Sequence, residues 1–267
     1  MSTPQLTAIR TANTSVQQSA SAATLTLTNP FDFEAGPAPN CGLMLAVISI
    51  KSNATVTTAT AGWTKLAQDN SGANFTQALF IAASNAANPV FTWTGAVACF
   101  GMIVPIQNPS SPLRVSGVGA ASVTSGSGTT HTSTSINTTE PLSLAVYIDT
   151  SNVNTAMAQP TGWTEAIDLA AATAVGRVVV GSKDIAVEGD PSGAISVTGS
   201  SGNWVQRQIE VSLEPLTNDV AVNSTELVSI IEPEPGLAVS FVELVSIIEV
   251  APIPPINDLG RRLILIN

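Results

Sequence analysis

The stretch AVACFGMIVPI, residues 96–106, is the longest of six short apolar runs that decide the fold class of this chain. Its length and its β-branched residues are typical of a buried β-strand. Gly, Pro, Asn and Ser punctuate the chain between the runs, and no convincing amphipathic helix is present. The other five runs are residues 43–50, 77–83, 142–148, 176–181 and 204–213. The sequence therefore predicts an all-β protein, an antiparallel β-sandwich.

The last of these runs, WVQRQIEVSL at 204–213, predicts a strand with two unlike faces. Its apolar face would hold Val205, Ile209, Val211 and Leu213, and its polar face Gln206, Gln208, Glu210 and Ser212, with a bulge near Arg207. One segment, DLAAATAV at 168–175, has the alanines to make a turn of helix.

Composition and charge narrow the class of partner. The 267 residues are 44% hydrophobic and only 10% charged, and the formal net charge is −10. Such a charge repels phosphate backbones and anionic lipid heads, so we expect no nucleic-acid partner. The N-terminal residues show neither a signal-peptide pattern nor a span of about 18 apolar residues, so the sequence predicts no membrane insertion. Cys41 and Cys99 lie in apolar runs, which favours buried free thiols over a disulfide.

Two similar segments indicate an internal repeat. TATAGWTKLAQ at 58–68 is echoed by AQPTGWTEAID at 158–168, and Trp63 and Trp163 each stand between a Gly and a Thr. A Gly permits a tight turn, and a Trp beside it can cap a sheet and bury its large ring. The second interpretation is that Trp63 and Trp163 stack against sugars of a host glycan. We predict one sandwich of two pseudo-repeated halves.

The predicted organisation has three parts. Residues 1–20 form an N-terminal lead, and residues 21–215 form the body, with halves at about 21–116 and 130–215. The Gly/Ser/Thr-rich residues 117–141 between them are typical of either a flexible joint or an edge strand. Residues 216–267 form an extended C-terminal arm.

The arm contains the phrase ELVSIIE twice, at Glu226–Glu232 and at Glu243–Glu249. A strand of this sequence is apolar on both faces and is too short to cover itself. Burying about five aliphatic side chains per copy would contribute on the order of 8–15 kcal/mol before ordering costs. We expect each copy to dock on a sheet edge of a neighbouring subunit. The alternatives are that the arm completes its own sandwich or is disordered. The expected docking residues are Leu227, Val228, Ile230, Ile231, Leu244, Val245, Ile247 and Ile248.

The body also resembles a known family. Residues 15–214 are similar to jelly-roll-like β-sandwich proteins with GWT motifs that tailed phages and prophages encode as structural proteins. The matching pieces are AGWTKLA, NPVFTWTGAVACFGMIVPIQ, TEPLSLAVYI, QPTGWTEAID and WVQRQIEVSLEP. The chain departs from the family pattern at Ala61, where a proline or small polar residue is usual, and at IVP, which replaces GVD. The resemblance implies a jelly-roll-like fold and a virion setting more than a precise role.

Catalytic and metal-binding patterns are scarce. His131 is the sole histidine, and its Ser/Thr/Gly-rich surroundings predict a solvated loop or edge residue. No nucleophile elbow, phosphate-binding loop or paired-cysteine motif occurs. Asp184, Glu188 and Asp190 have oxygens for Ca²⁺ but lack the EF-hand spacing. We therefore expect no enzyme activity, such as polysaccharide cleavage, and no cofactor or metal.

These observations lead to one favoured function and one alternative. We expect a virion protein, made in the host cytoplasm, that decorates or cements the capsid or forms part of a fibre. Its partners would be itself, as a homotrimer, and other capsid or tail subunits. The alternative is a receptor-binding fibre tip that binds a host surface glycan.

Overall fold

The computed structural model describes residues 5–6, 16–30, 41–83, 86–107, 114–140, 143–154, 156–170 and 176–214. The chain divides into two units, residues 1–218 and residues 219–267, and all described residues lie in the first. They form strands and irregular segments without a helix, which confirms the predicted all-β class for this part of the chain. No helix among them is therefore long and apolar enough to cross a membrane.

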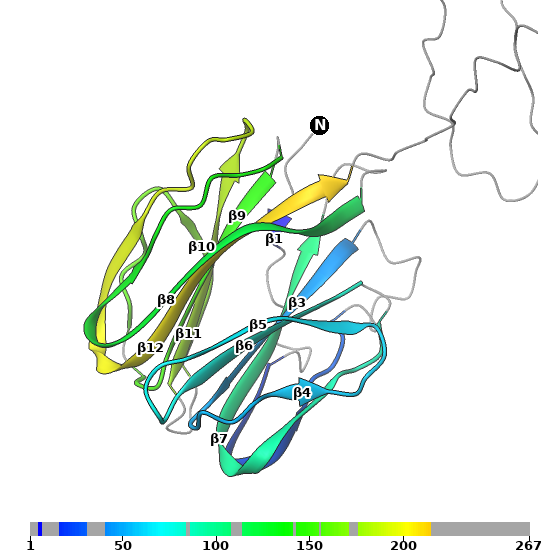
Figure 1. Ribbon diagram of the computed structural model, residues 1–267, viewed down its shortest axis with the longest axis vertical. Coiled ribbons are helices and arrows are strands. Elements are labelled where there is room, and N and C mark those ends of the chain that lie inside the picture. Colours follow the sequence, from blue (N-terminus) through cyan, green and yellow to red (C-terminus); the bar gives the residue numbers. More distant parts are fainter. Residues whose placement is uncertain are drawn as a thin grey trace, which may run out of the picture. The chain divides into compact units, whose positions relative to one another are not determined.

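Two antiparallel sheets make up this unit (Figure 1). The first sheet contains β1 (Gln5–Leu6), β2 (Val16–Thr26), β3 (Cys41–Ile50), β4 (Thr57–Thr58), β5 (Trp63–Asn70), β6 (Thr76–Ala82) and β7 (Val90–Gln107). The second contains β8 (Arg114–Ser133), β9 (Ser143–Ser151), β10 (Thr164–Ala170), β11 (Arg177–Ile185) and β12 (Ile195–Glu214). All six predicted apolar runs lie wholly or almost wholly in strands.

The two sheets have the same strand order. The first reads β2-β7-β3-β6-β5, with β1 and β4 also pairing with β7, and the second reads β8-β12-β9-β11-β10. With the two-residue strands β1 and β4 set aside, each sheet has five strands in the described part of the chain. Numbered in chain order within each sheet, these five strands lie side by side in the order first, fifth, second, fourth, third. This shared order lets positions in one sheet be matched to positions in the other.

The two GWT segments also have the same local geometry. Gly62 has a φ of 86° and Gly162 a φ of 81°, in the region that favours glycine. The Trp63 amide donates to the Thr60 carbonyl, and the Trp163 amide donates to the Pro160 carbonyl. The strand that follows each turn is irregular at the same place, since the register shifts between residues 65 and 67 and between residues 165 and 167.

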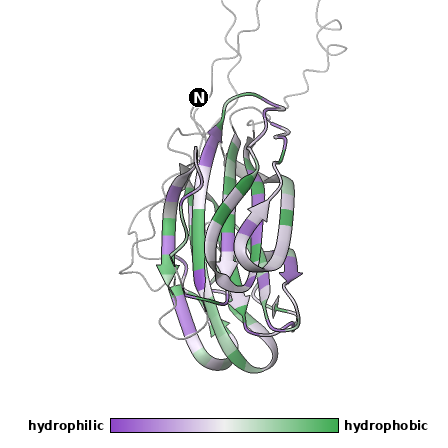
Figure 2. Cartoon of the chain, turned by 90° about the vertical axis from the view of Figure 1, so that its left-hand side faces the viewer, coloured by the Kyte–Doolittle hydropathy of each residue, from purple (hydrophilic) through white to green (hydrophobic). Residues whose placement is uncertain are grey.

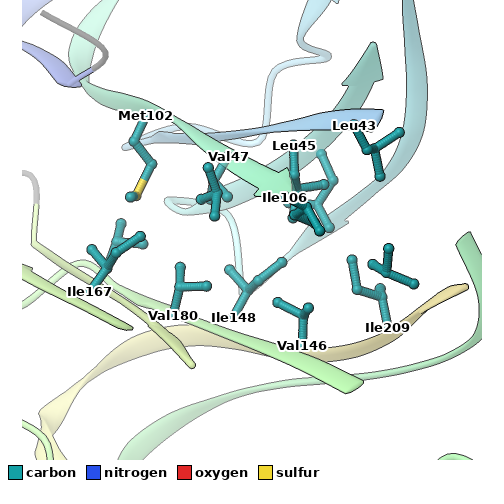
Figure 3. Packing of buried hydrophobic residues seen from close by; sticks show 14 of the residues in the cluster. Leu43, Leu45, Val47, Met102, Ile106, Val146, Ile148, Ile167, Val180 and Ile209 are labelled. Atoms are coloured by element: carbon teal, nitrogen blue, oxygen red, sulfur yellow. The ribbon is translucent and has the colours of Figure 1, made fainter. Parts of the chain in front are cut away.

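The main core lies between the sheets (Figure 3). Alternate residues of each strand point into it, because successive side chains of a strand face opposite sides. Leu45, Val47 and Met102 face Val146 and Ile148 across this layer. Figure 2 shows the resulting pattern, with hydrophobic residues recurring along the strands and hydrophilic residues between them. The apolar runs of the sequence thus supply most of this layer.

Each sheet also buries its outer face. Two long ribbons, β2–β7 and β8–β12, curl at one end (Figure 1). In the first sheet, Leu25 and Phe91 of the curled part pack on Ile48. In the second sheet, Ile195 and Val197 pack on the outer face. We call residues 130–133 and 195–198, which pair with each other, the ribbon end.

Several local predictions differ from the structure. Residues 16–20 belong to β2, and residues 168–170 belong to β10, because pairing with β7 and β11 outweighs the weak helix preference of the alanines. For the hydroxyl-rich segment 117–141, in contrast, the edge-strand alternative is confirmed, since most of it belongs to β8. No bulge occurs at Arg207, which pairs regularly with Ile148 and Val123.

Candidate functional site

A buried polar cluster lies on the outer face of the second sheet, beneath the ribbon end. β9 contributes Asp149, β12 contributes Gln206, and β8 contributes His131 because the ribbon end folds back over this face. The Nδ1 atom of His131 lies 3.0 Å from both carboxylate oxygens of Asp149. The Nε2 atom of Gln206 donates to Asp149 Oδ2 at 2.9 Å. His131 is 0% exposed and Asp149 is 1% exposed, so water does not screen the pair.

The imidazole of His131 is held between two neighbours. It stacks on the indole of Trp204, with ring centroids 4.9 Å apart and an angle of 18° between the planes. Gly199 lies against its other atoms, since a Cβ at this position would stand 3.2 Å from both Cε1 and Nε2. The ring therefore has a fixed orientation, with Nδ1 directed at Asp149.

Electrostatics at the cluster are dominated by burial. Burial raises the pKa of Asp149, although the hydrogen bonds from His131 and Gln206 and the nearby histidine charge act to lower it. Burial also raises the pKa of Tyr147 on the same strand, and the charges of Glu165, Asp149 and Asp168 raise it further. Both groups thus bind their protons more tightly than they would in water.

Four polar atoms around this cluster are buried without a hydrogen-bond partner in the described part of the chain: His131 Nε2, Tyr147 Oη, Trp204 Nε1 and Gln206 Oε1. Buried polar atoms are nearly always paired, because an unpaired one costs about 1–3 kcal/mol. The concentration of four at one place marks this face as energetically costly. Unpaired buried groups call for an explanation, and groups with perturbed pKa values cluster at functional sites.

The equivalent place in the first sheet is apolar. The strand pairing matches positions in the two sheets. Thr64 pairs with a residue of β6 that also pairs with Leu45, and Thr164 pairs with a residue of β11 that also pairs with Val146. Three residues further along, Ile48 in β3 corresponds to Asp149 in β9. Ile48 pairs with Gly101, whereas Asp149 pairs with Gln206. The two sheets therefore share a scaffold, and only the second has a polar cluster at this position.

A carboxylate further along the same face has a different environment. Glu210 accepts hydrogen bonds from the amides of Ala120, Thr139 and Glu140 and from the Thr139 hydroxyl. Burial acts to raise the pKa of Glu210, but these donors together hold it below its ordinary value. The side chain therefore stays ionised and ties residues 139–140 to β12.

Polar side chains also link the two sheets. Arg207 forms an ion pair with Asp69 of β5, and its Nε atom lies 3.4 Å from Gln77 Oε1. Gln77 Nε2 donates to Thr150 Oγ1 at 3.0 Å and to the Val205 carbonyl at 3.2 Å. Burial lowers the pKa of Arg207 to about 10, which leaves it charged at neutral pH. These contacts fix the two sheets at one end of the core.

The structure places Trp63 and Trp163, the two tryptophans of the GWT segments, in the core. Trp63 is 7% exposed, donates from Nε1 to the Ala87 carbonyl at 2.8 Å and packs edge-on against Phe91. Trp163 is 5% exposed and packs edge-on against Tyr147. These positions support the packing interpretation, because a sugar stacks on an exposed ring face.

The prediction for His131 is correct in one part, because the residue lies on the edge strand β8, and wrong in the other, because its side chain is buried. The residue is neither in a loop nor solvated, because the fold-back of the ribbon end places it under Trp204 and against Asp149. Sequence reasoning also missed Asp149 and Gln206. The sequence signals that could have pointed to them were weak. Asp149 directly follows the apolar run at 142–148, and Gln206 belongs to the polar residues that alternate with apolar ones in β12.

The remaining predicted sites have varied outcomes. Cys99 is a buried free thiol, as expected, whereas the side chain of Cys41 lies outside the described part. Asp184, Glu188 and Asp190 are exposed, and the described residues contain no group of three or more potential metal ligands. All the expected docking residues lie outside the described part: Leu227, Val228, Ile230, Ile231, Leu244, Val245, Ile247 and Ile248.

A surface depression of about 410 Å³ adjoins the first GWT turn. Its described lining is uncharged and consists of hydroxyl and methyl groups from Thr57, Thr58, Ala59, Thr60, Val90 and Thr92. Two of the hydroxyls bond to each other, since Thr57 Oγ1 lies 3.0 Å from Thr92 Oγ1. Such a lining suits a neutral ligand better than an ion.

Comparison of this chain with protein families, with curated proteins and with solved structures finds no match.

Proposed function

We propose that this chain is a structural protein of a tailed-phage particle, with a jelly-roll-like, internally duplicated body and a C-terminal arm that attaches it to neighbouring subunits. The body would sit on the virion exterior, as capsid decoration or cement or as a fibre component. The resemblance of residues 15–214 to phage GWT proteins supports the setting, and the shared strand order of the two sheets supports the duplication.

The single observation that carries the proposal is the duplicated ELVSIIE segment, which follows the body in the sequence. The hydrophobic faces of the body's sheets are already buried by residues of the body itself. Three hydrophobic clusters composed of body residues cover the space between the sheets and both outer faces. Polar side chains such as Arg207 and Glu210 have their partners within the body. Two extra strand-like segments, apolar on both faces, therefore favour contact with another chain.

Deletion of residues 216–267 tests this proposal. We expect the truncated chain to remain a folded, β-rich monomer and to lose both self-association and incorporation into particles, whereas the full chain forms a trimer. Light scattering and circular dichroism of the two purified proteins measure this. A truncated chain that assembles as the full chain does would contradict the proposal.

The hydroxyl-lined depression favours a second candidate, a fibre tip that binds a neutral host glycan. Thr57 and Thr92 lie at its rim and are not part of the main core. Substitution Thr92→Arg would place a charged, bulky side chain in the depression. Under this candidate the variant loses glycan-array binding that the unchanged protein shows, and the absence of any array signal from the unchanged protein would dismiss it.

A further inference from the structure

We propose that His131 and Asp149 form a proton-controlled latch, which holds the ribbon end on the outer face of the second sheet and opens when the pair loses its titratable proton. The inference goes beyond the assembly role and does not depend on the arm.

The first support is geometric. Asp149 lies on the central strand β9, whereas His131 lies on the ribbon end, so their contact joins the fold-back to the sheet. The ribbon end also packs through Ile195 and Val197. Its only charge-capable link to the sheet among the described residues is the His131–Asp149 pair.

The second support is a pair of glycine-containing bends. The register between β8 and β12 breaks between the pairs Thr198–Thr130 and Gly202–Gly128. Gly128 has a φ of 119°, and a Cβ placed there would meet no atom within 4 Å. The ribbon end is thus joined to the rest of the sheet by a short break in the ladder, Thr129 on β8 and residues 199–201 on β12, which is flanked by the Gly128–Gly202 pair. Such a break lets the ribbon end open while the main sheet stays intact.

The third support is the charge of the pair. With one titratable proton, on the imidazole or on the carboxyl group, the buried pair has no net charge. When this proton leaves to solvent, the pair carries one negative charge. A buried charge without a counter-ion is costly, and opening of the ribbon end would hydrate it.

The groups that face the pair do not compensate this charge. β12 contributes the neutral side chains of Gln206 and Trp204, and the segment at 152–163 contributes Met157 next to Gly199. β9 contributes Tyr147, which also feels the acids Glu165 and Asp168 of β10.

Two cations of β11 lie on this face. Arg177 is opposite Ser151, two residues or about 7 Å along a strand from Asp149, but its guanidinium pairs with Asp168. The other cation is more remote. Lys183 of β11 lies opposite Ala145, four residues before Asp149 on β9, which is about 13 Å along a strand. Its Nζ atom donates to the Ser192 carbonyl.

The sign of the pH effect follows from Asp149. Burial raises its pKa, so the folded state binds this proton more tightly than the unfolded chain does. The stabilisation is complete below the ordinary carboxyl pKa and is lost as the pH rises through the raised pKa of the folded state. We therefore expect the latch to be closed while the pair holds one titratable proton and to open as the pH rises and that proton is lost.

Opening would uncover aromatic side chains. His131 covers one face of Trp204, and Val197 packs in the same cluster as Tyr147 and Trp163. The device thus switches an aromatic surface between hidden and accessible states.

Hydrogen exchange of the full chain tests the latch. Protection factors, corrected for intrinsic exchange, are measured between pH 4.5 and 8.5 for amides at 128–133 and 195–202, with β3 as internal reference. We expect protection of the ribbon end to fall with rising pH, by up to about tenfold per pH unit where one proton is lost, while protection of β3 stays constant. Equal pH dependence in both regions of the unchanged protein overturns the proposal.

Two variants sharpen the test. Asp149→Asn removes the titrating carboxyl group and should abolish the pH dependence of the ribbon end. Asp184→Asn, at an exposed position of β11, removes the same charge elsewhere and should leave the pH dependence unchanged. Persistence of the pH dependence in a folded Asp149→Asn protein overturns the proposal. If this variant does not fold, the comparison of the ribbon end with β3 in the unchanged protein decides alone.

Discussion

Arg207 of β12 and Asp69 of β5 form an ion pair that joins the two sheets of the body. The guanidinium is almost fully buried, whereas the carboxylate is 30% exposed. Arg207 stands in the row of inward-facing residues that also contains Ile209 and Val211. A charged side chain thus lies within a layer that is mostly apolar, beside the polar side chains of Gln77 and Thr150.

Removal of one partner should cost more than removal of both charges. We expect Asp69→Asn to lower the free energy of unfolding by about 1–3 kcal/mol, because it leaves the buried guanidinium without its counter-ion. The double variant Asp69→Asn, Arg207→Met should lose less, since a methionine fits an apolar layer. Urea unfolding measures both. A double variant less stable than Asp69→Asn would show that the pair is net stabilising.

The two GWT tryptophans should contribute similar stability. Trp63→Ala and Trp163→Ala each remove a buried indole, so we expect each to lower the free energy of unfolding by about 3–5 kcal/mol. Thermal and urea unfolding of the two variants check this. A loss below about 1 kcal/mol in either variant would mean that its ring does not pack as described.

Glu210 should make stability depend on acid pH. Its folded-state pKa is lowered, so its stabilisation is present above the ordinary carboxyl pKa and is lost as the pH falls through the lowered pKa. We expect Glu210→Gln to be about 1–3 kcal/mol less stable than the unchanged protein at pH 7, and the difference to shrink below about pH 4. Unfolding curves between pH 3 and 7 measure it. A difference that is independent of pH would contradict the assignment.

Gly176 should tolerate no side chain. Its φ is 125°, and a Cβ there would stand 1.6 Å from the Ser151 carbonyl oxygen, a backbone atom that cannot rotate away. We expect Gly176→Ala to destabilise the fold by about 3 kcal/mol or more. Gly189→Ala is the matched control, because Gly189 has a φ of 83° and open space around it, so only backbone strain of about 1–2 kcal/mol applies. Equal losses in the two variants would show that the close approach is unimportant.

Length and β-branched content were sufficient to predict the strands that form the main core. The run at 96–106 is apolar throughout, since Met102 and Val104 face the main core and Cys99 and Ile103 pack on the outer face. The GWT segments likewise predict their turns, because glycine readily adopts the positive φ that Gly62 and Gly162 have. The edge strands were harder to predict. β8 is rich in Gly, Ser and Thr, and it forms a strand because β12 supplies a paired edge along most of its length.

The polar cluster could not be predicted from the sequence. His131 and Asp149 are 18 residues apart, and nothing in their neighbours indicates that they meet. Their contact depends on the bend that carries the ribbon end across the second sheet. Asp149 in β9 occupies the position that Ile48 occupies in β3, which is the clearest sign that the second sheet has a polar cluster. This correspondence can be recognised only after the register of both sheets is known.

The sequence by itself determined the all-β class, the main apolar strands and the two GWT turns, because these depend on the alternation of residues and on glycine conformation within a few positions. The tertiary structure alone decided which polar residues are buried and whom they contact. Burial of His131, Asp149 and Arg207 results from long-range pairing and ribbon curvature, which bring together residues far apart in the chain and remove water from around them.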